Sequence, residues 1–309
     1  MAERVLRSAP AVLPLLLRAG AGAIPGVPPL PIGEGVDGDP SQTTLVLDSG
    51  PADRDRLARY DRVCGFDVSD ALPLTYPHVL AFGLQMTLLS SSAFPLPLPG
   101  LVHIANRIER RRTIDAGEPL QLRVSLAPIE PHPRGSSVTV ATEARAGEDT
   151  VWAEWSTMLH RGTPPVGESA GAVAPPASLA APPPGAELPA AAVWRLPGDL
   201  GRRYAAVSGD RNPIHLHALT AKPFGFARPL AHGMWTLARC LAALGPELPE
   251  AVTVEAAFRR PLLLPAVVAF AEAASDGSVI AFGVRDLADG TPHLDGVARQ
   301  SPSGSVAAS

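Results

Sequence analysis

Residues 204–235 read YAAVSGDRNPIHLHALTAKPFGFARPLAHGMW, and they gather ionisable side chains in a segment that is otherwise apolar and broken by Gly and Pro. Asp210, Asn212 and His215 fall within six residues, and His232 follows further along. Three interpretations compete: a metal site, an acid–base site, and a hydrogen-bonded turn without chemistry. Asp and Asn beside Gly and Pro are common turn formers, so the choice depends on the rest of the chain.

The composition limits the class of protein. The chain has 309 residues, the length of two ordinary domains or one large one, and 46% are apolar, enough for a sizeable core. A net charge of −4 gives no basic face for neutralising phosphates, so nucleic acid is not an expected partner. Cys64 and Cys240 lie far apart without metal-ligand spacing, which favours a reducing compartment.

The N-terminal segment faintly resembles a secretory signal, because Arg4 and Arg7 precede a short apolar run. Glu3, two interrupting prolines and Arg18 argue against a signal. No other stretch approaches the roughly 20 uninterrupted apolar residues that a membrane span needs. We therefore expect a cytoplasmic protein without a membrane span.

A proline-rich segment divides the chain. Residues 163–188 contain seven prolines and almost no large apolar residue, so we expect a flexible, partly extended linker. The linker leaves two halves of similar size, 40–162 and 189–300. An N-terminal extension, 1–39, and a tail, 301–309, flank them.

The two halves repeat each other. YDRVCGF at 60–66 matches YAAVSGD at 204–210, an offset of 144 residues. Two later matches share an offset of 150 residues and pair Ala81 with Ala231 and Val102 with Val252. A constant offset in two segments indicates a duplicated fold, and the second copy has six more residues before its Ala-x-Gly.

Each copy is expected to hold one buried helix followed by several antiparallel strands. Met234, Leu237, Leu241 and Leu244 have helical spacing, and Gly245 should end that helix. Apolar alternation between turn residues predicts strands at 102–110, 120–130, 137–146, 150–159, 252–258, 266–275, 279–287 and 293–300. A sheet curled around one helix is an α+β unit.

The motif YAAVSGDRNPIH followed by GFARPLAHGM resembles the signature of the MaoC-like, R-specific enoyl-CoA hydratases. The resemblance implies a double hot-dog fold, in which two antiparallel sheets each wrap a central helix and pack as a pseudo-dimer. It also implies a hydro-lyase that interconverts trans-2-enoyl and (3R)-3-hydroxyacyl thioesters of coenzyme A or acyl-carrier protein in fatty-acid or related metabolism. We expect no cofactor, and either a monomer or a homodimer of double hot dogs.

This chemistry assigns roles to the motif. Adding water to an enoyl thioester needs a group that takes a proton from water, a proton source for the α-carbon, and donors that face the thioester oxygen. By the resemblance, Asp210 and His215 are the catalytic pair, and Asn212 with Ser208 orients water or substrate. The backbone N–H of Gly233, at the positive end of a helix, would polarise the thioester carbonyl.

The remaining histidines have other interpretations. We expect His232, Phe226 and Met234 to line or support the acyl pocket. A metal site built from His215, His217 and His232 is the alternative. No Cys or further carboxylate accompanies them at familiar ligand spacing, so we expect no metal.

The first half should be a degenerate, non-catalytic hot dog. Phe66 stands at the position of Asp210 and Phe82 at that of His232, and Phe cannot transfer a proton. We expect this half to pack against the catalytic half and to shape the substrate tunnel.

Two alternative functions stay open, an acyl-CoA thioesterase and a non-catalytic subunit that binds acyl thioesters. A further set of basic side chains offers candidates for contacts with coenzyme A phosphates: Arg202, Arg203, Lys222, Arg259 and Arg260.

Overall fold

One continuous twelve-stranded sheet forms the frame of the computed structural model, which describes residues 2–12, 14–15, 36, 38–98, 100–162, 188–275 and 279–301. The first-half strands are β1 (Ala2–Leu6), β2 (Thr43–Gly50), β3 (Leu101–Arg110), β4 (Leu120–Leu126), β5 (Glu130–His132), β6 (Gly135–Ala146) and β7 (Asp149–Arg161). The second-half strands are β8 (Ala190–Leu196), β9 (Val252–Phe258), β10 (Ala266–Ser275), β11 (Val279–Asp286) and β12 (Pro292–Gln300). All eight predicted strands are present.

The strand order shows the duplication directly. The sheet runs β1-β2-β4-β6-β7-β3-β9-β12-β11-β10-β8, with β5 paired to β6 at the side. Apart from β1 and β5, each half places its first, third, fourth, fifth and second strands in that spatial order. The neighbours pair antiparallel except for β1 and β2, which run parallel. The hot-dog expectation is confirmed, and the two predicted sheets are joined edge to edge.

The junction between the halves is the pairing of β3 with β9. Asn106 lies opposite Ala256, 150 residues further along, which equals the sequence offset of the repeat. The local two-fold axis therefore passes through this residue pair. The second-copy strand thus replaces the partner that a homodimer would supply.

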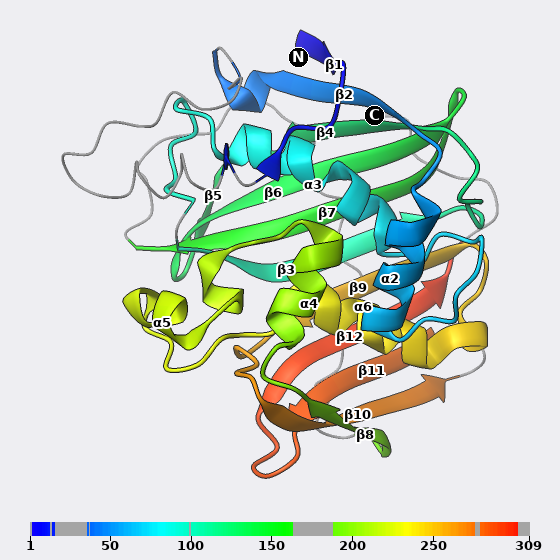
Figure 1. Cartoon of the computed structure of the whole chain (residues 1–309), viewed down its shortest axis with the longest axis vertical. Coiled ribbons are helices and arrows are strands. Elements are labelled where there is room, and N and C mark those ends of the chain that lie inside the picture. The colour runs from blue at the N-terminus through cyan, green and yellow to red at the C-terminus, as the bar shows by residue number, and fades with distance from the viewer. Residues whose placement is uncertain are drawn as a thin grey trace.

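The helices lie on one face of the sheet (Figure 1). They are α2 (Arg54–Cys64), α3 (Tyr76–Leu89), α4 (Leu200–Ser208), α5 (Ala218–Ala221) and α6 (Gly233–Leu244), with short 3₁₀ turns η1 (Pro40–Gln42), η3 (Pro213–His215), η4 (Lys222–Phe224) and η5 (Gly245–Glu247). Helix α6 confirms the predicted buried helix and ends at Gly245. Tyr60 of α2 and Tyr204 of α4, equivalent in the repeat, approach to 6.0 Å between ring centroids.

The two central helices differ in where they begin. Helix α6 starts at Gly233, whereas the equivalent Gly83 lies in the middle of α3, which starts at Tyr76. The first half has six fewer residues than the second between the equivalent tyrosine and the equivalent glycine. Its central helix instead begins seven residues before that glycine. Gly83 also faces the N-terminal segment, because a Cβ there would lie 2.7 Å from the carbonyl oxygen of Pro10.

Parts of the sequence analysis lie outside the described residues. The predicted linker, 163–188, falls there apart from Leu188, and the tail, 301–309, apart from Ser301. The boundaries of the two halves therefore stay predictions. None of the helices in the described ranges is long and apolar enough to cross a membrane.

The β3–β9 junction predicts that the second half does not stand alone. A fragment from Ala190 to Ser301 would expose the hydrogen-bonding edge of β9, and an unpaired edge promotes association between chains. We expect this fragment to self-associate or to unfold at least several degrees below the intact chain, measured by size-exclusion chromatography and thermal denaturation. Adding the fragment 2–162 should restore a compact species. A monomeric, equally stable 190–301 fragment would contradict this.

Candidate active site

The motif is built as a turn that holds ionisable groups. Helix α4 ends at Gly209, whose φ of 87° is in the left-handed region that glycine adopts freely. The N–H of Asp210 then donates to Ser208 Oγ at 3.1 Å, and the N–H of Asn212 donates to Asp210 Oδ1 at 3.0 Å. Asn212 Oδ1 in turn caps η3 by accepting from the N–H of Ile214. The turn interpretation and the acid–base interpretation therefore describe the same segment.

Glycine at position 201 lets the motif lie against α4. A Cβ at Gly201 would overlap the backbone carbonyl oxygen of His215. The guanidinium of Arg202 adds a hydrogen bond of 2.9 Å to the carbonyl of Leu216. Gly201 and Arg202, in the first turn of α4, thus determine how closely the backbone at His215 and Leu216 packs against this helix.

The hydrogen bond made by His215 determines its tautomer. Its Nδ1 lies 2.9 Å from the carbonyl oxygen of Leu230, and a carbonyl can only accept, so Nδ1 carries the hydrogen. Burial lowers the pKa of His215 below its ordinary value, so the ring is neutral at pH 7. Its Nε2 then carries a lone pair, which meets no hydrogen-bond donor among the described residues and is the form a general base needs.

His232 is held neutral beside it. The two rings stack with centroids 3.7 Å apart, and Nε2 of His232 donates to the backbone carbonyl of Asp210 at 3.1 Å. Burial, together with the neighbouring His215, lowers the pKa of His232 to about 3. His232 is therefore a poor proton carrier at neutral pH, and its geometry suits a supporting role.

Asp210 is the charged member of the cluster. Its side chain is 26% exposed, and Oδ2 lies 3.7 Å from Nε2 of His232. Burial acts to raise the pKa of Asp210, but His232, His215 and the N–H of Asn212 outweigh it and bring the pKa below the ordinary value. A carboxylate and a neutral imidazole therefore lie close together, with one ligand atom of Asp210 and one of His215 within 4.8 Å.

Gly233 begins α6 directly after His232. The first N–H groups of a helix have no intrahelical acceptor, so this N–H is available to an oxyanion. A Cβ at Gly233 would lie 3.1 Å from the ring of Phe258 on β9, which explains the small residue. Met234 is buried in the core and Phe226 is half-buried, so their predicted pocket roles stay predictions.

The cluster also has the residue types of a metal site. One ligand atom each from Asp210, His215 and His232 lies within 4.8 Å of the others. His217, a member of the metal set weighed from the sequence, instead caps α5, its Nδ1 accepting from the N–H of Leu219. The two cluster rings are stacked, so their in-plane lone pairs converge poorly on a single ion.

The first half braces the motif. Arg56 of α2 donates through Nε to the carbonyl of Val207 at 2.8 Å and through a terminal nitrogen to that of Ser208 at 3.2 Å. These are the last carbonyls of α4, which a cation stabilises. The sequence pattern did not identify Arg56, Phe258 or the Leu230 carbonyl, because each acts through a contact distant in sequence.

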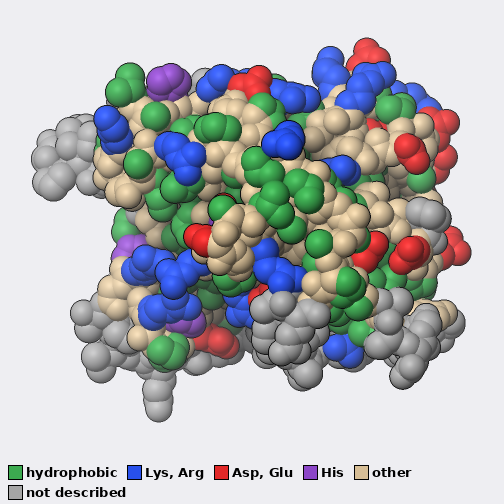
Figure 2. All heavy atoms as spheres, turned by 90° about the horizontal axis from the view of Figure 1, so that it is seen from below, with side chains coloured by type: hydrophobic (Ala, Val, Ile, Leu, Met, Phe, Trp, Pro, Cys, Tyr) green, Lys and Arg blue, Asp and Glu red, His purple; other side chains and the backbone are tan. Residues whose placement is uncertain are grey.

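A basic groove lies at the other end of α4. It has a volume of about 390 Å³, and the guanidinium of Arg239 lies 4.7 Å above the ring of Trp194. Four arginines line it: Arg62, Arg195, Arg203 and Arg239. Among the other sequence candidates, Arg259 is paired with Asp295 at 2.6 Å. Figure 2 views the molecule from the end of the sheet that carries β8. Most of the acidic side chains visible on this face lie in the right half of the picture.

Comparison with known proteins identifies relatives of this arrangement. Residues 187–278 match the family described as MaoC like domain. The curated 3-hydroxyacyl-thioester dehydratase X of Mycobacterium tuberculosis is 36% identical over 290 residues, which are 94% of this chain and 98% of that protein.

Solved structures agree with this. The crystal structure of HtdX from M. tuberculosis has a TM-score of 0.72 and 33% identity, and the match covers 84% of this chain and 100% of that one. A MaoC-like dehydratase from Phytophthora capsici has a TM-score of 0.66 at 18% identity, covering 84% and 95%, and shows the shared fold alone.

The close approach at Gly201 gives a sharp test of the site geometry. Gly201→Ala places a methyl group on the His215 carbonyl, so we expect the motif to shift and activity to fall at least about tenfold, since small misplacements of reacting groups are costly. Gly198→Ala is the matched control, because a Cβ there makes only an ordinary 3.7 Å contact with Pro265. Steady-state kinetics and thermal denaturation of both variants are compared. Equal activity in the two would show that this contact does not position His215.

Proposed function

This chain belongs to the MaoC-like dehydratase family, and on that premise we propose that it interconverts trans-2-enoyl and (3R)-3-hydroxyacyl thioesters by adding or removing water. The observation that carries the proposal is the proximity of an ionised Asp210 to a neutral His215, each with a ligand atom within 4.8 Å of the other, while the Leu230 carbonyl occupies His215 Nδ1 and leaves Nε2 as the basic nitrogen. The reaction is that of a hydro-lyase in fatty-acid or related acyl metabolism.

The proposed mechanism uses these two groups on one water molecule. In hydration, the water donates hydrogen bonds to the Asp210 carboxylate and to His215 Nε2, and its oxygen bonds to carbon 3 as it loses a proton. The same pair returns that proton to carbon 2 from the same face, so the product gains one OH and one H. Negative charge that builds on the thioester oxygen meets the N–H of Gly233. Ser208 and Asn212 hold the turn, and His232 supports the His215 ring.

A second candidate is thioester hydrolysis. A carboxylate can also activate water for that reaction, and the hot-dog fold alone does not decide between the two. The Asp-x-Asn-Pro-Ile-His arrangement in a chain of the MaoC-like family favours hydration. A non-catalytic acyl-binding role is disfavoured because the motif is complete.

We further propose a carrier-bound substrate. Coenzyme A and the arm of acyl-carrier protein both bear phosphate, and guanidinium groups bind phosphate well. In the described part of the chain, the four arginines of the basic groove form no ion pair with a carboxylate, so their positive charge can attract such a group. The preference between the two carriers, a cytoplasmic location and a monomeric or dimeric state stay predictions.

Substitution of the catalytic pair tests the mechanism. We expect Asp210→Asn and His215→Ala each to reduce crotonyl-CoA hydration by about 10²–10⁴-fold, because each removes a proton-transfer group. The assay follows loss of the enoyl absorbance, and chiral chromatography should identify the (3R)-hydroxy product.

The outcomes separate the candidate functions. Release of free thiol at the rate of enoyl loss would favour the thioesterase, and mainly (3S) product would mean that the motif is misread. Near-wild-type turnover in either variant, with folding verified by circular dichroism, would rule out the proposed pair.

Chelation tests the metal alternative. Since proton transfer by Asp210 and His215 needs no ion, we expect dialysis against a strong chelator to leave turnover within about twofold, with no recovery on adding zinc. A loss of activity that zinc restores, with metal detected by elemental analysis, would instead assign the cluster of Asp210, His215 and His232 to a metal site.

A further inference from the structure

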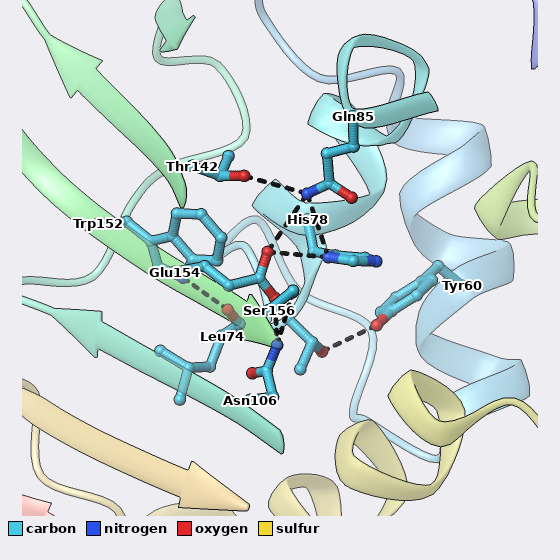
Figure 3. A network of polar contacts seen from close by, with 10 residues as sticks. Tyr60, Leu74, His78, Gln85, Asn106, Thr142, Trp152, Glu154 and Ser156 are labelled. Carbon is cyan, nitrogen blue, oxygen red and sulfur yellow. Dashed lines mark hydrogen bonds and ion pairs between the residues drawn. The ribbon is translucent and has the colours of Figure 1, made fainter. Parts of the chain in front are cut away.

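A buried polar network occupies the half that lacks the motif (Figure 3). Glu154 of β7 is fully buried, and it accepts from His78 Nδ1 and from Asn106 Nδ2, each at 2.8 Å. Gln85 of α3 lies 3.4 Å from the same carboxylate and donates to Thr142 at 3.0 Å. The network therefore crosses from helix α3 to strands β3, β6 and β7.

The central pair is ionic. Burial acts to raise the pKa of Glu154, but the charge and hydrogen bond of His78 and the amide of Asn106 bring it below the ordinary value. Burial acts to lower the pKa of His78, and Glu154 outweighs it, so the net shift is upward. Each group thus favours the charged form of the other, an imidazolium at His78 facing a carboxylate at Glu154.

The fold does not require this network, because the second half does without it. The strand registers that align Asn106 with Ala256 also align Ser156 with Gly296, Glu154 with Leu294 and Thr142 with Val284. All four second-half residues are buried and none carries a polar side chain. A buried ion pair is often no more stabilising than apolar residues of similar size, so stability alone does not account for it.

Two routes through neighbouring residues connect the network to the proposed active site. The first route runs along β3 from Asn106 to His103. The ring of His103 lies 4.6 Å from that of Phe258, which packs against Gly233. His103 Nε2 is buried without a hydrogen-bond partner in the described part of the chain.

The second route passes through Tyr204 and Tyr60. Tyr204 lies 4.8 Å from His232 and 6.0 Å from Tyr60, whose hydroxyl bonds to Thr75 at 2.8 Å. Thr75 is the residue before α3, and His78 lies in its first turn. The two routes thus reach Gly233 and His232, on either side of the start of α6, and the charge of His78 acts on Asp210.

The second ring nitrogen of His78 is the free end of the network. Nδ1 is committed to Glu154, and Nε2 points away from that carboxylate (Figure 3). The side chain keeps 8% exposure, and no hydrogen bond to Nε2 is found among the described residues. A protonated His78 therefore holds one fixed, unused N–H donor.

We propose that His78, aimed by Glu154 and Asn106, is a second donor to the thioester oxygen and complements the N–H of Gly233. This inference rests on the proposed function. Sites that stabilise an oxyanion use preorganised donors in a water-poor setting, and a fixed cation is stronger than a neutral donor. The half without the motif then contributes directly to the reaction.

Removal of the donor is the first test. We expect His78→Phe to reduce kcat for crotonyl-CoA hydration about 10²–10³-fold, the usual cost of losing one such donor, with a smaller change in KM. His78→Gln places a neutral amide N–H near the position of Nε2 and should recover part of the loss. His160→Phe, on the same strand as Glu154 and partly exposed, is the matched control and should stay near wild type.

The pH profile separates a catalytic role from a structural one. Since Nδ1 donates to Glu154, loss of a proton turns Nε2 from donor to acceptor, so turnover should fall as pH rises through the pKa of His78. The ionisable groups that face His78 are Glu154 from β7, His103 from β3 and Asp210 beyond α4. Glu154→Gln removes the main cause of the raised pKa, so the alkaline fall should move to lower pH.

The outcomes are distinguishable. Folded His78→Phe protein with kcat within threefold of wild type would overturn this inference and leave the proposed function intact. An unchanged alkaline limb in Glu154→Gln would also overturn it. Loss of thermal stability in His78→Phe that His78→Gln restores, without any restoration of kcat, would assign a structural role instead. Absence of hydration in the wild-type protein would overturn the proposed function and this inference together.

Discussion

The backbone ladder between β3 and β9 is the constraint on which the rest of the molecule depends. It fixes Asn106 opposite Ala256 and so sets the register of every other equivalent pair in the two halves. Through it, one edge of each sheet is satisfied by the other, and helices of both halves cover a common face (Figure 1). Any slip of one residue would move buried side chains of β3 to the opposite face. The register therefore also fixes where the segment around Asp210 meets the first half.

The two halves have diverged in the same structural positions. The second half keeps its helix short and uses the preceding residues for the motif, while the first extends its helix back to Tyr76. Arg56 links them by binding the carbonyls at the end of α4, directly before Asp210. The first half thus packs against the motif, and it also carries a polar network with no counterpart in the second half.

The strands, the repeat and the candidate site residues could be predicted from the sequence because their signals are local. Strands with alternating apolar residues and the compact Asp-x-Asn-Pro-Ile-His segment are local patterns, and the repeat offset supplied the pairing of halves. The protonation states of the ionisable side chains could not be predicted, because they depend on residues distant in the sequence. The tautomer of His215 depends on a carbonyl fifteen residues away, and the ionic state of His78 depends on Glu154, 76 residues away. A carboxylate two residues after Trp152, in the same phase of β7, was the one visible sign of the network, since that phase points inward.

The pairing of two unequal copies in one chain has an evolutionary consequence. In a homodimer, each substitution enters both subunits, so a Glu at position 154 would also replace its equivalent, the buried Leu at position 294. Duplication and fusion remove that coupling, and each copy then evolves under its own selection. A substitution in one copy of this chain, such as Glu154, therefore leaves the equivalent position of the other copy unchanged.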